Sequence, residues 1–208
     1  MLELAAAFVL LAAAALGICS AIAGLRQEHA RALITLAAGV NAAFLLVPLG
    51  LSLRTGRLEA QGAFLLQAAA FGLMLAGALL IAGAVKQEAG HGKLKGFGGM
   101  YYRSPWLAAA MTALLLSLAG LPVSGGFFGR LFILLETVSA GLYWVGASLL
   151  AAAAVTCYTL FGFIVQMYMR SYDGADKIGI KLSLLQRTMI GACALGSIVL
   201  GLVPGLLL

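Results

Sequence analysis

The chain has 208 residues, of which 63% are hydrophobic and only 10% are charged, and its mean hydropathy is +1.07. This composition excludes a soluble domain of this length, because much of the surface of a soluble protein must be polar. The formal net charge of +6 does not indicate nucleic-acid binding, since the basic residues stand singly between apolar runs and form no basic stripe.

Apolar runs of about 20 residues fit the thickness of a bilayer when they are helical. Ala, Leu and Gly dominate these runs and no alternating pattern is present, which favours helices over a membrane barrel. Glu3 and the missing basic start distinguish the first run from a cleaved signal peptide. We therefore predict an all-α, polytopic transmembrane bundle that forms a single membrane domain over residues 1–208. The predicted spans cover residues 2–25, 31–53, 61–85, 105–121, 141–169 and 184–207.

The segment 122–141 is the ambiguous part of this assignment. Pro122, Gly125 and Gly126 should break a helix, since proline lacks a donor and glycine has a low helix propensity. The following residues fit a short span, a re-entrant segment or half of a discontinuous helix, so six or seven spans are predicted. Six crossings place most Lys and Arg residues on one side, whereas seven divide them evenly. The positive-inside rule thus favours six crossings, or a broken helix that hides a seventh, and leaves the orientation open.

Arg130 and Glu136 are the only charged residues between Ser104 and Met169. A charge deep in a bilayer costs several kcal/mol, so it must be buried in protein, paired or hydrated. Six residues apart on a straight helix, the two side chains point to different faces and do not pair with each other. Arg130 either extends to the lipid headgroups from a span boundary, or lies beside a helix break whose free backbone groups hold water, as in the ion sites of transporters.

Other polar groups in the spans have two interpretations each. Tyr158 could line a hydrated channel or bond within its own helix, and Asn41 and Gln67 are expected to join helices. The three cysteines lie apart from one another in apolar segments, which predicts neither a metal site nor a redox motif.

The stretch "SPWLAAAMTALLLSLAGLPVSGGFFGRLFILLETVSAGLYW" (104–144) resembles the antiporter-like membrane subunits of respiratory complex I, in particular the NuoN type. The similarity continues through "TCYTLFGFIVQMYMR" (156–170) and, more weakly, back to residues 15–46. It covers nearly the whole chain, but only about the C-terminal half of a usual family member. The first half of the family, with its glutamate–lysine pair, has no counterpart in the sequence.

The resemblance implies a non-catalytic, multi-pass protein of the bacterial cytoplasmic (inner) membrane, in a complex that couples electron transfer to proton movement. Its partners would be other membrane subunits and lipids. The chain itself would bind no cofactor, and the quinone, the flavin and the iron–sulfur clusters would belong to other subunits. The alternatives are a subunit of a membrane-bound hydrogenase or of a multi-subunit cation/proton antiporter, a purely structural subunit, and an independent small transporter or assembly factor.

The chain departs from the family pattern at the residues proposed to relay protons. One family lysine falls on Arg130, and arginine keeps the charge but hardly releases its proton. A second family lysine falls on Ala30, next to Arg31. These losses predict a scaffold or modulatory role. Arg130, Glu136, Arg31 and Tyr158 remain the candidates for a proton path.

Overall fold

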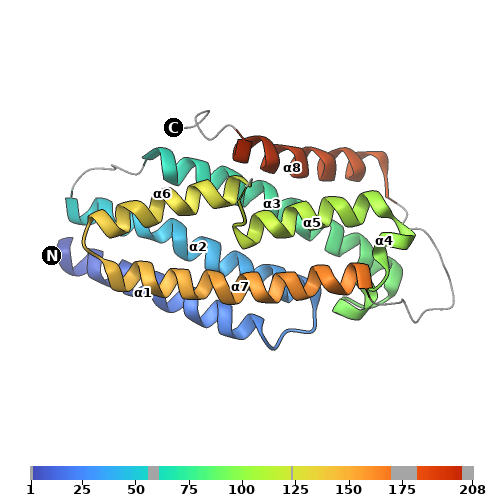
Figure 1. The fold of residues 1–208 in the computed structure, drawn as a ribbon, viewed down its shortest axis with the longest axis horizontal. Coiled ribbons are helices and arrows are strands. Elements are labelled where there is room, and N and C mark those ends of the chain that lie inside the picture. The colour runs from blue at the N-terminus through green and yellow to red at the C-terminus, as the bar shows by residue number, and fades with distance from the viewer. Residues whose placement is uncertain (1, 56–60, 123, 170–181, 203–208) are drawn as a thin grey trace.

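The computed structural model describes residues 2–55, 61–122, 124–169 and 182–202. Within these ranges the chain is helical and contains no strand, which confirms the predicted all-α bundle (Figure 1). Five helices are long and apolar enough to cross a membrane, so the chain is an integral membrane protein. The helices are α1 (Leu2–Gly24), α2 (Ala30–Thr55), α3 (Gln61–Ala89), η1 (Leu94–Phe97), α4 (Met100–Arg103), α5 (Pro105–Ala119), α6 (Gly125–Ser139), α7 (Tyr143–Met169) and α8 (Leu184–Leu202).

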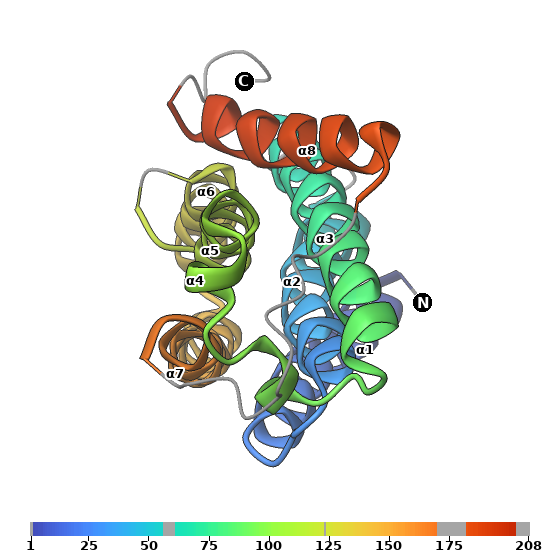
Figure 2. The ribbon, with the colours of Figure 1, turned by 90° about the vertical axis from the view of Figure 1, so that its right-hand side faces the viewer.

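Helices α5 and α6 have 15 residues each, so each is about 22 Å long and too short to cross a hydrocarbon core of about 30 Å. They lie end to end along the bundle in Figure 1 and overlap when the bundle is viewed along its length in Figure 2. Together they form one discontinuous span. Within the described ranges, this span and the five long helices make six spans, the number that the charge bias favoured.

The break between α5 and α6 comes slightly earlier than the sequence suggested. Helix α5 ends at Gly120, which has φ 76° and donates its N–H to the carbonyl oxygens of the preceding turn, as a left-handed C-terminal glycine does. Pro122 lies inside the break, as predicted. Gly125 and Gly126 instead form the first turn of α6, so their role is in packing rather than in ending a helix.

The turn between α1 and α2 lies against the long connector that follows α3. The N–H of Ala30 donates to the carbonyl of Gly92 (2.9 Å), and the N–H of Leu94 donates to the carbonyl of Glu28 (2.7 Å). Beyond this bridge the connector turns into the bundle, where the ring of Phe97 is fully buried. The described ends of α1 and α3 and the start of α5 therefore meet at one end of the bundle (Figure 1).

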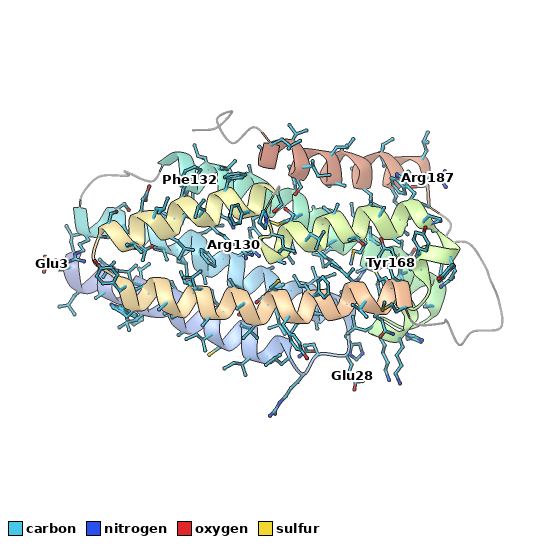
Figure 3. All side chains as sticks on the ribbon, viewed as in Figure 1. Glu3, Glu28, Arg130, Phe132, Tyr168 and Arg187 are labelled. Atoms are coloured by element: carbon cyan, nitrogen blue, oxygen red, sulfur yellow. The ribbon has the colours of Figure 1, made fainter. Side chains whose placement is uncertain are left out.

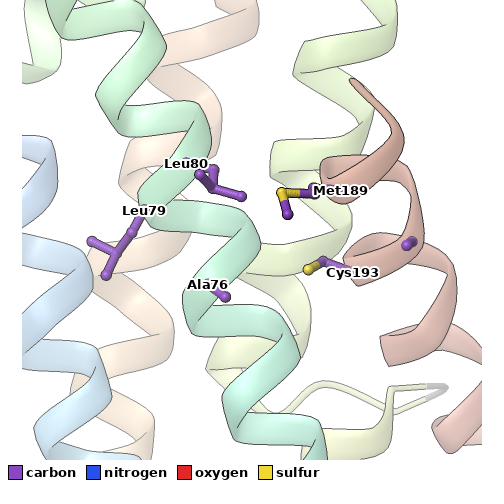
Figure 4. A pocket seen from close by; sticks show the side chains of 6 residues that line it. Ala76, Leu79, Leu80, Met189 and Cys193 are labelled. Atoms are coloured by element: carbon purple, nitrogen blue, oxygen red, sulfur yellow. The ribbon is translucent and has the colours of Figure 1, made fainter. Parts of the chain in front are cut away.

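Two clusters of buried apolar side chains fill the bundle. One lies among α2, α3, α5, α7 and α8, and the other among α1, α2, α6 and α7. Helix α8 crosses obliquely over α3 and the α5–α6 span (Figure 2). A groove of about 540 Å³ opens between α3 and α8, and apolar side chains such as Leu80 and Met189 line it together with Cys193 (Figure 4).

Candidate functional site

Arg130 lies near the start of α6, and its side chain points into the middle of the bundle (Figure 3). Only 5% of its surface is exposed. The side chain is therefore buried in protein and does not extend to the outer surface. This is the burial that a charge in a membrane span requires when no headgroup is within reach.

The guanidinium of Arg130 closes the end of the neighbouring half-helix. Its Nη1 donates to the carbonyl of Ala119 (2.8 Å), and its Nη2 donates to the carbonyl of Leu118 and to Oδ1 of Asn41 (2.8 Å). The guanidinium carbon lies 5.2 Å from the centre of the Phe44 ring, which adds a cation–π contact. One side chain of α6 thus binds the last two residues of α5 and a residue of α2.

The contacts explain how the charge is tolerated without a carboxylate among these partners. The last carbonyl groups of a helix have no partner within the helix and carry the negative end of its dipole. Arg130 donates to two of these carbonyl groups of α5, so the helix end itself compensates the positive charge. Gly120 leaves the space for this arrangement, since a Cβ atom there would lie only 2.5 Å from Nη1 of Arg130.

Asn41 and Gln67 extend the polar cluster to two more helices, and both are fully buried. The side-chain amide of Asn41 donates to the carbonyl groups of Ala37 (3.0 Å) and Leu118 (3.2 Å). Its Oδ1 also accepts Nε2 of Gln67 (3.1 Å). Helices α2, α3, α5 and α6 therefore meet at one cluster of amides, carbonyl groups and a guanidinium, which we call the Arg130 cluster (Asn41, Gln67, Leu118, Ala119 and Arg130).

Two buried polar atoms of the Arg130 cluster have no hydrogen-bond partner in the described part of the chain. They are Oε1 of Gln67, an acceptor, and Nε of Arg130, a donor. A water molecule commonly bridges such atoms in a protein interior. The cluster can thus hold a fixed positive charge and bind water, but a guanidinium hardly releases its proton and is a poor proton relay.

The structure places the other candidates for a proton path away from these contacts. Glu136 lies further along α6 and is half-buried, whereas Arg31 is exposed at the start of α2. Tyr158 is 75% exposed on α7. The hydrogen bonds of Arg130 go to none of the three, and their assignment to a proton path stays a prediction. The sequence predicted that Asn41 and Gln67 join helices, but not that they belong to the Arg130 cluster. The signal for both residues is a single amide side chain within an apolar span.

Gly125 and Gly126 let the half-helices pack closely against their neighbours. A Cβ atom at Gly125 would lie 2.9 Å from Leu200 Cβ, and one at Gly126 would overlap the carbonyl oxygen of Ser117. No group of three or more His, Cys, Asp or Glu side chains that could hold a metal is found within the described ranges.

Comparison with known proteins places the chain in a family. The family model described as "NADH:quinone oxidoreductase/Mrp antiporter, TM" matches residues 1–167. The NADH-quinone oxidoreductase subunit N of Paenibacillus sp. (strain JDR-2) is 40% identical over 96% of this chain. The chain spans only 38% of the length of that relative.

Solved structures share the fold. A chain of respiratory complex I from Thermus thermophilus superposes with a TM-score of 0.84 at 20% identity, covering 99% of this chain and 42% of that one. A chain of the Mrp complex from Dietzia sp. DQ12-45-1b gives a TM-score of 0.83 at 16% identity, covering 97% and 45%. At these identities the likeness concerns the arrangement of the helices alone.

Proposed function

Since the chain belongs to the NADH:quinone oxidoreductase/Mrp antiporter transmembrane family, we propose that it is a membrane subunit of a complex I-related assembly that translocates protons. Residues 1–208 act in this proposal as a single membrane domain. The domain corresponds to one part of a full-length subunit N.

The observation that carries the proposal is the Arg130 cluster. A proton relay needs a group that gains and loses a proton, and the guanidinium at the α5–α6 break does not do so at accessible pH. It is instead a fixed charge that cross-links α2, α5 and α6. We therefore assign the chain a scaffold or modulatory role, in which Arg130 orients water and biases protonation in a neighbouring channel.

The proposal includes partners and a location. Other membrane subunits and lipids surround the chain in the cytoplasmic (inner) membrane of a bacterium. The quinone, the flavin and the iron–sulfur clusters of the assembly belong to other subunits, because neither the sequence nor the Arg130 cluster offers ligands for such groups.

A multi-subunit cation/proton antiporter is the second candidate. The description of the matching family model includes the Mrp antiporter, and the helices superpose on a chain of an Mrp complex. In such an assembly the Arg130 cluster would keep the same structural role, but the driving reaction would be ion exchange instead of electron transfer.

Purification of the tagged chain in mild detergent from its native membrane tests the proposal. We expect other membrane subunits and redox subunits to co-purify, with NADH-dependent quinone reduction in the same fraction. Co-purification with cation/proton antiporter subunits and no redox subunit would favour the second candidate. A monodisperse chain without partners would contradict both.

A further inference from the structure

A hollow of about 330 Å³ opens on the outside of the bundle, between the end of α1, the C-terminal half of α7 and the connector that follows α3. Leu33, Leu94 and Phe161 give it apolar surface, and Gln27 and Tyr158 add polar groups. It lies apart from the Arg130 cluster, at the end of the bundle where the α1–α2 turn meets the connector. We call it the α1–α7 hollow.

The two glycines that line this hollow have free space beside them. A Cβ atom at Gly162 on α7 would meet no other atom within 4 Å, and one at Gly24 would make only ordinary contacts, the nearest at 3.7 Å from Leu33. The aromatic side chains on the same stretch of α7 project to the surface, with Tyr158 75% and Phe161 57% exposed. An apolar, unfilled space thus opens beside aromatic rings, which are typical of the headgroup level of a membrane.

Cations flank the residues that line the hollow. Arg26 stands between two lining residues in the α1–α2 turn, and Lys93 and Lys95 stand on either side of Leu94. All three cations are exposed, and their long side chains can reach across apolar surface while the charge stays at the interface. Glu28 is the acidic residue of the same turn, so the surroundings keep a net positive charge.

We propose that the α1–α7 hollow binds one anionic phospholipid. Lys93, Lys95 and Arg26 bind the phosphate, and the hydroxyl of Tyr158 donates a hydrogen bond to it. The glycerol and the start of an acyl chain fill the space beside Gly162. This inference does not depend on the proposed function of the assembly.

The position of the hollow favours a lipid over a soluble anion or a protein partner. Gly24 is the last residue of α1, so the hollow lies where a membrane span ends and headgroups begin. Basic residues at this level attract anionic lipids. A free phosphate would need the cations but not the apolar surface of Leu33 and Phe161, whereas a diacyl lipid uses both.

The test uses the assembly purified in mild detergent, stripped of lipid and titrated with phosphatidylglycerol or phosphatidylcholine. Lipid bound per chain is measured by mass spectrometry. Gly162→Leu fills the hollow, Lys93→Gln with Lys95→Gln removes two cations, and Tyr158→Phe removes only one hydroxyl. Gly72→Leu is the matched control for volume, because a Cβ atom at Gly72 also meets no atom within 4 Å. Arg54→Gln is the control for charge, because Arg54 is exposed at the other end of the bundle.

We expect saturable binding of phosphatidylglycerol and weaker binding of phosphatidylcholine. The double lysine variant should bind phosphatidylglycerol about 30-fold more weakly, the factor that two cations at a membrane surface supply together. Tyr158→Phe should weaken binding about 5-fold, Gly162→Leu should abolish it, and both controls should bind as the wild type does.

The inference is overturned if phosphatidylcholine binds equally well, or if the conservative Tyr158→Phe and the double lysine variant both bind like the wild type. Displacement by millimolar inorganic phosphate alone would also overturn it, since the apolar surface would then play no part. A cross-link from Tyr158 to a neighbouring subunit, with no retained lipid, would identify the hollow as a protein interface instead.

Discussion

Arg130 owes its position to groups that are remote in the sequence. The bond to Asn41 joins residues 89 positions apart, and the bonds to α5 reach back 11 and 12 positions across a helix break. The sequence left two positions open for Arg130, at the lipid headgroups or sheltered beside the helix break, because exposure to the interior of the bilayer is too costly. It could not predict which carbonyl groups shelter it, since that depends on the angle at which α6 leaves the break.

Two substitutions of Arg130 distinguish the effect of its positive charge from the effect of its several N–H donors. Arg130→Ala leaves the carbonyl groups of Ala119 and Leu118 and the amide of Asn41 without this donor, and we expect a loss of stability of about 3 kcal/mol. Arg130→Lys keeps the charge but cannot donate in the same fork. We expect it to assemble, and proton transport to be unchanged or higher because lysine can release a proton.

The measurements are the thermal midpoint of the purified assembly and proton uptake in vesicles. Unchanged assembly and proton transport in Arg130→Ala would show that the Arg130 cluster has no role in either.

Substitution of Asn41 gives a second test of the Arg130 cluster. Its side chain accepts a hydrogen bond from Arg130 and donates one to the carbonyl of Leu118. Asn41→Leu removes these bonds and leaves buried polar groups unpaired, so we expect a loss of about 2–4 kcal/mol in the free energy of unfolding. Asn41→Asp keeps an acceptor and places a negative charge beside the guanidinium, and it should cost less.

Thr137→Val is the matched control, since the buried hydroxyl of Thr137 donates within its own helix, to the carbonyl of Ile133. The thermal midpoints of the three variants give the comparison. Equal midpoints for Asn41→Leu and Thr137→Val would contradict the cross-linking role.

At the scale of the helices, the hydrophobic runs predicted the long spans to within a few residues, except that the predicted end of the last span, at residue 207, lies outside the described residues. The first run ended at residue 25 and α1 ends at Gly24, and the third run began where α3 begins, at Gln61. The length of an apolar run is a strong signal of a membrane span, because the span must match the thickness of the bilayer. The break was harder to place, since any of the glycines between residues 120 and 126 could end a helix, and only packing shows that Gly120 does so.

Gly126 tests how closely α5 and α6 must approach. A methyl group there would overlap the carbonyl oxygen of Ser117, a backbone atom that cannot rotate away. Gly126→Ala should therefore lower the free energy of unfolding by about 2 kcal/mol, despite the better helix propensity of alanine. Gly72→Ala, which meets no atom within 4 Å, should leave the thermal midpoint unchanged or slightly higher. Equal thermal midpoints for Gly126→Ala and Gly72→Ala would contradict close packing between α5 and α6.

At the scale of the whole molecule, the end-to-end arrangement of α5 and α6 favours six spans over seven within the described residues. Composition and run length alone allowed six or seven, because a 15-residue helix looks like a short span in a sequence. Most described basic residues, such as Arg26, Lys93 and Lys95, lie toward the end of the bundle where Figure 3 shows Arg187, whereas Arg54 lies beside Glu3 at the other end. The positive-inside rule then predicts that the end with Arg187 faces the cytoplasm.

Cysteine labelling checks this orientation. The three native cysteines are first replaced by alanine, and a single cysteine is then introduced as His91→Cys at the basic end or Glu3→Cys at the other end. Both positions are exposed. An impermeant maleimide should label Glu3→Cys in right-side-out vesicles and His91→Cys only in inverted vesicles. The reverse pattern would show that the orientation follows something other than the basic residues.

The bonds from Arg130 to the end of α5 also have a mechanical consequence. A hydrogen bond of 2.8 Å weakens steeply when its atoms move apart by about 1 Å, so the two short helices cannot slide along their common axis without breaking it. The break between α5 and α6 is therefore a rigid connection and not a flexible hinge. Axial force applied to one short helix is therefore transmitted to the other until the hydrogen bonds of the Arg130 guanidinium break.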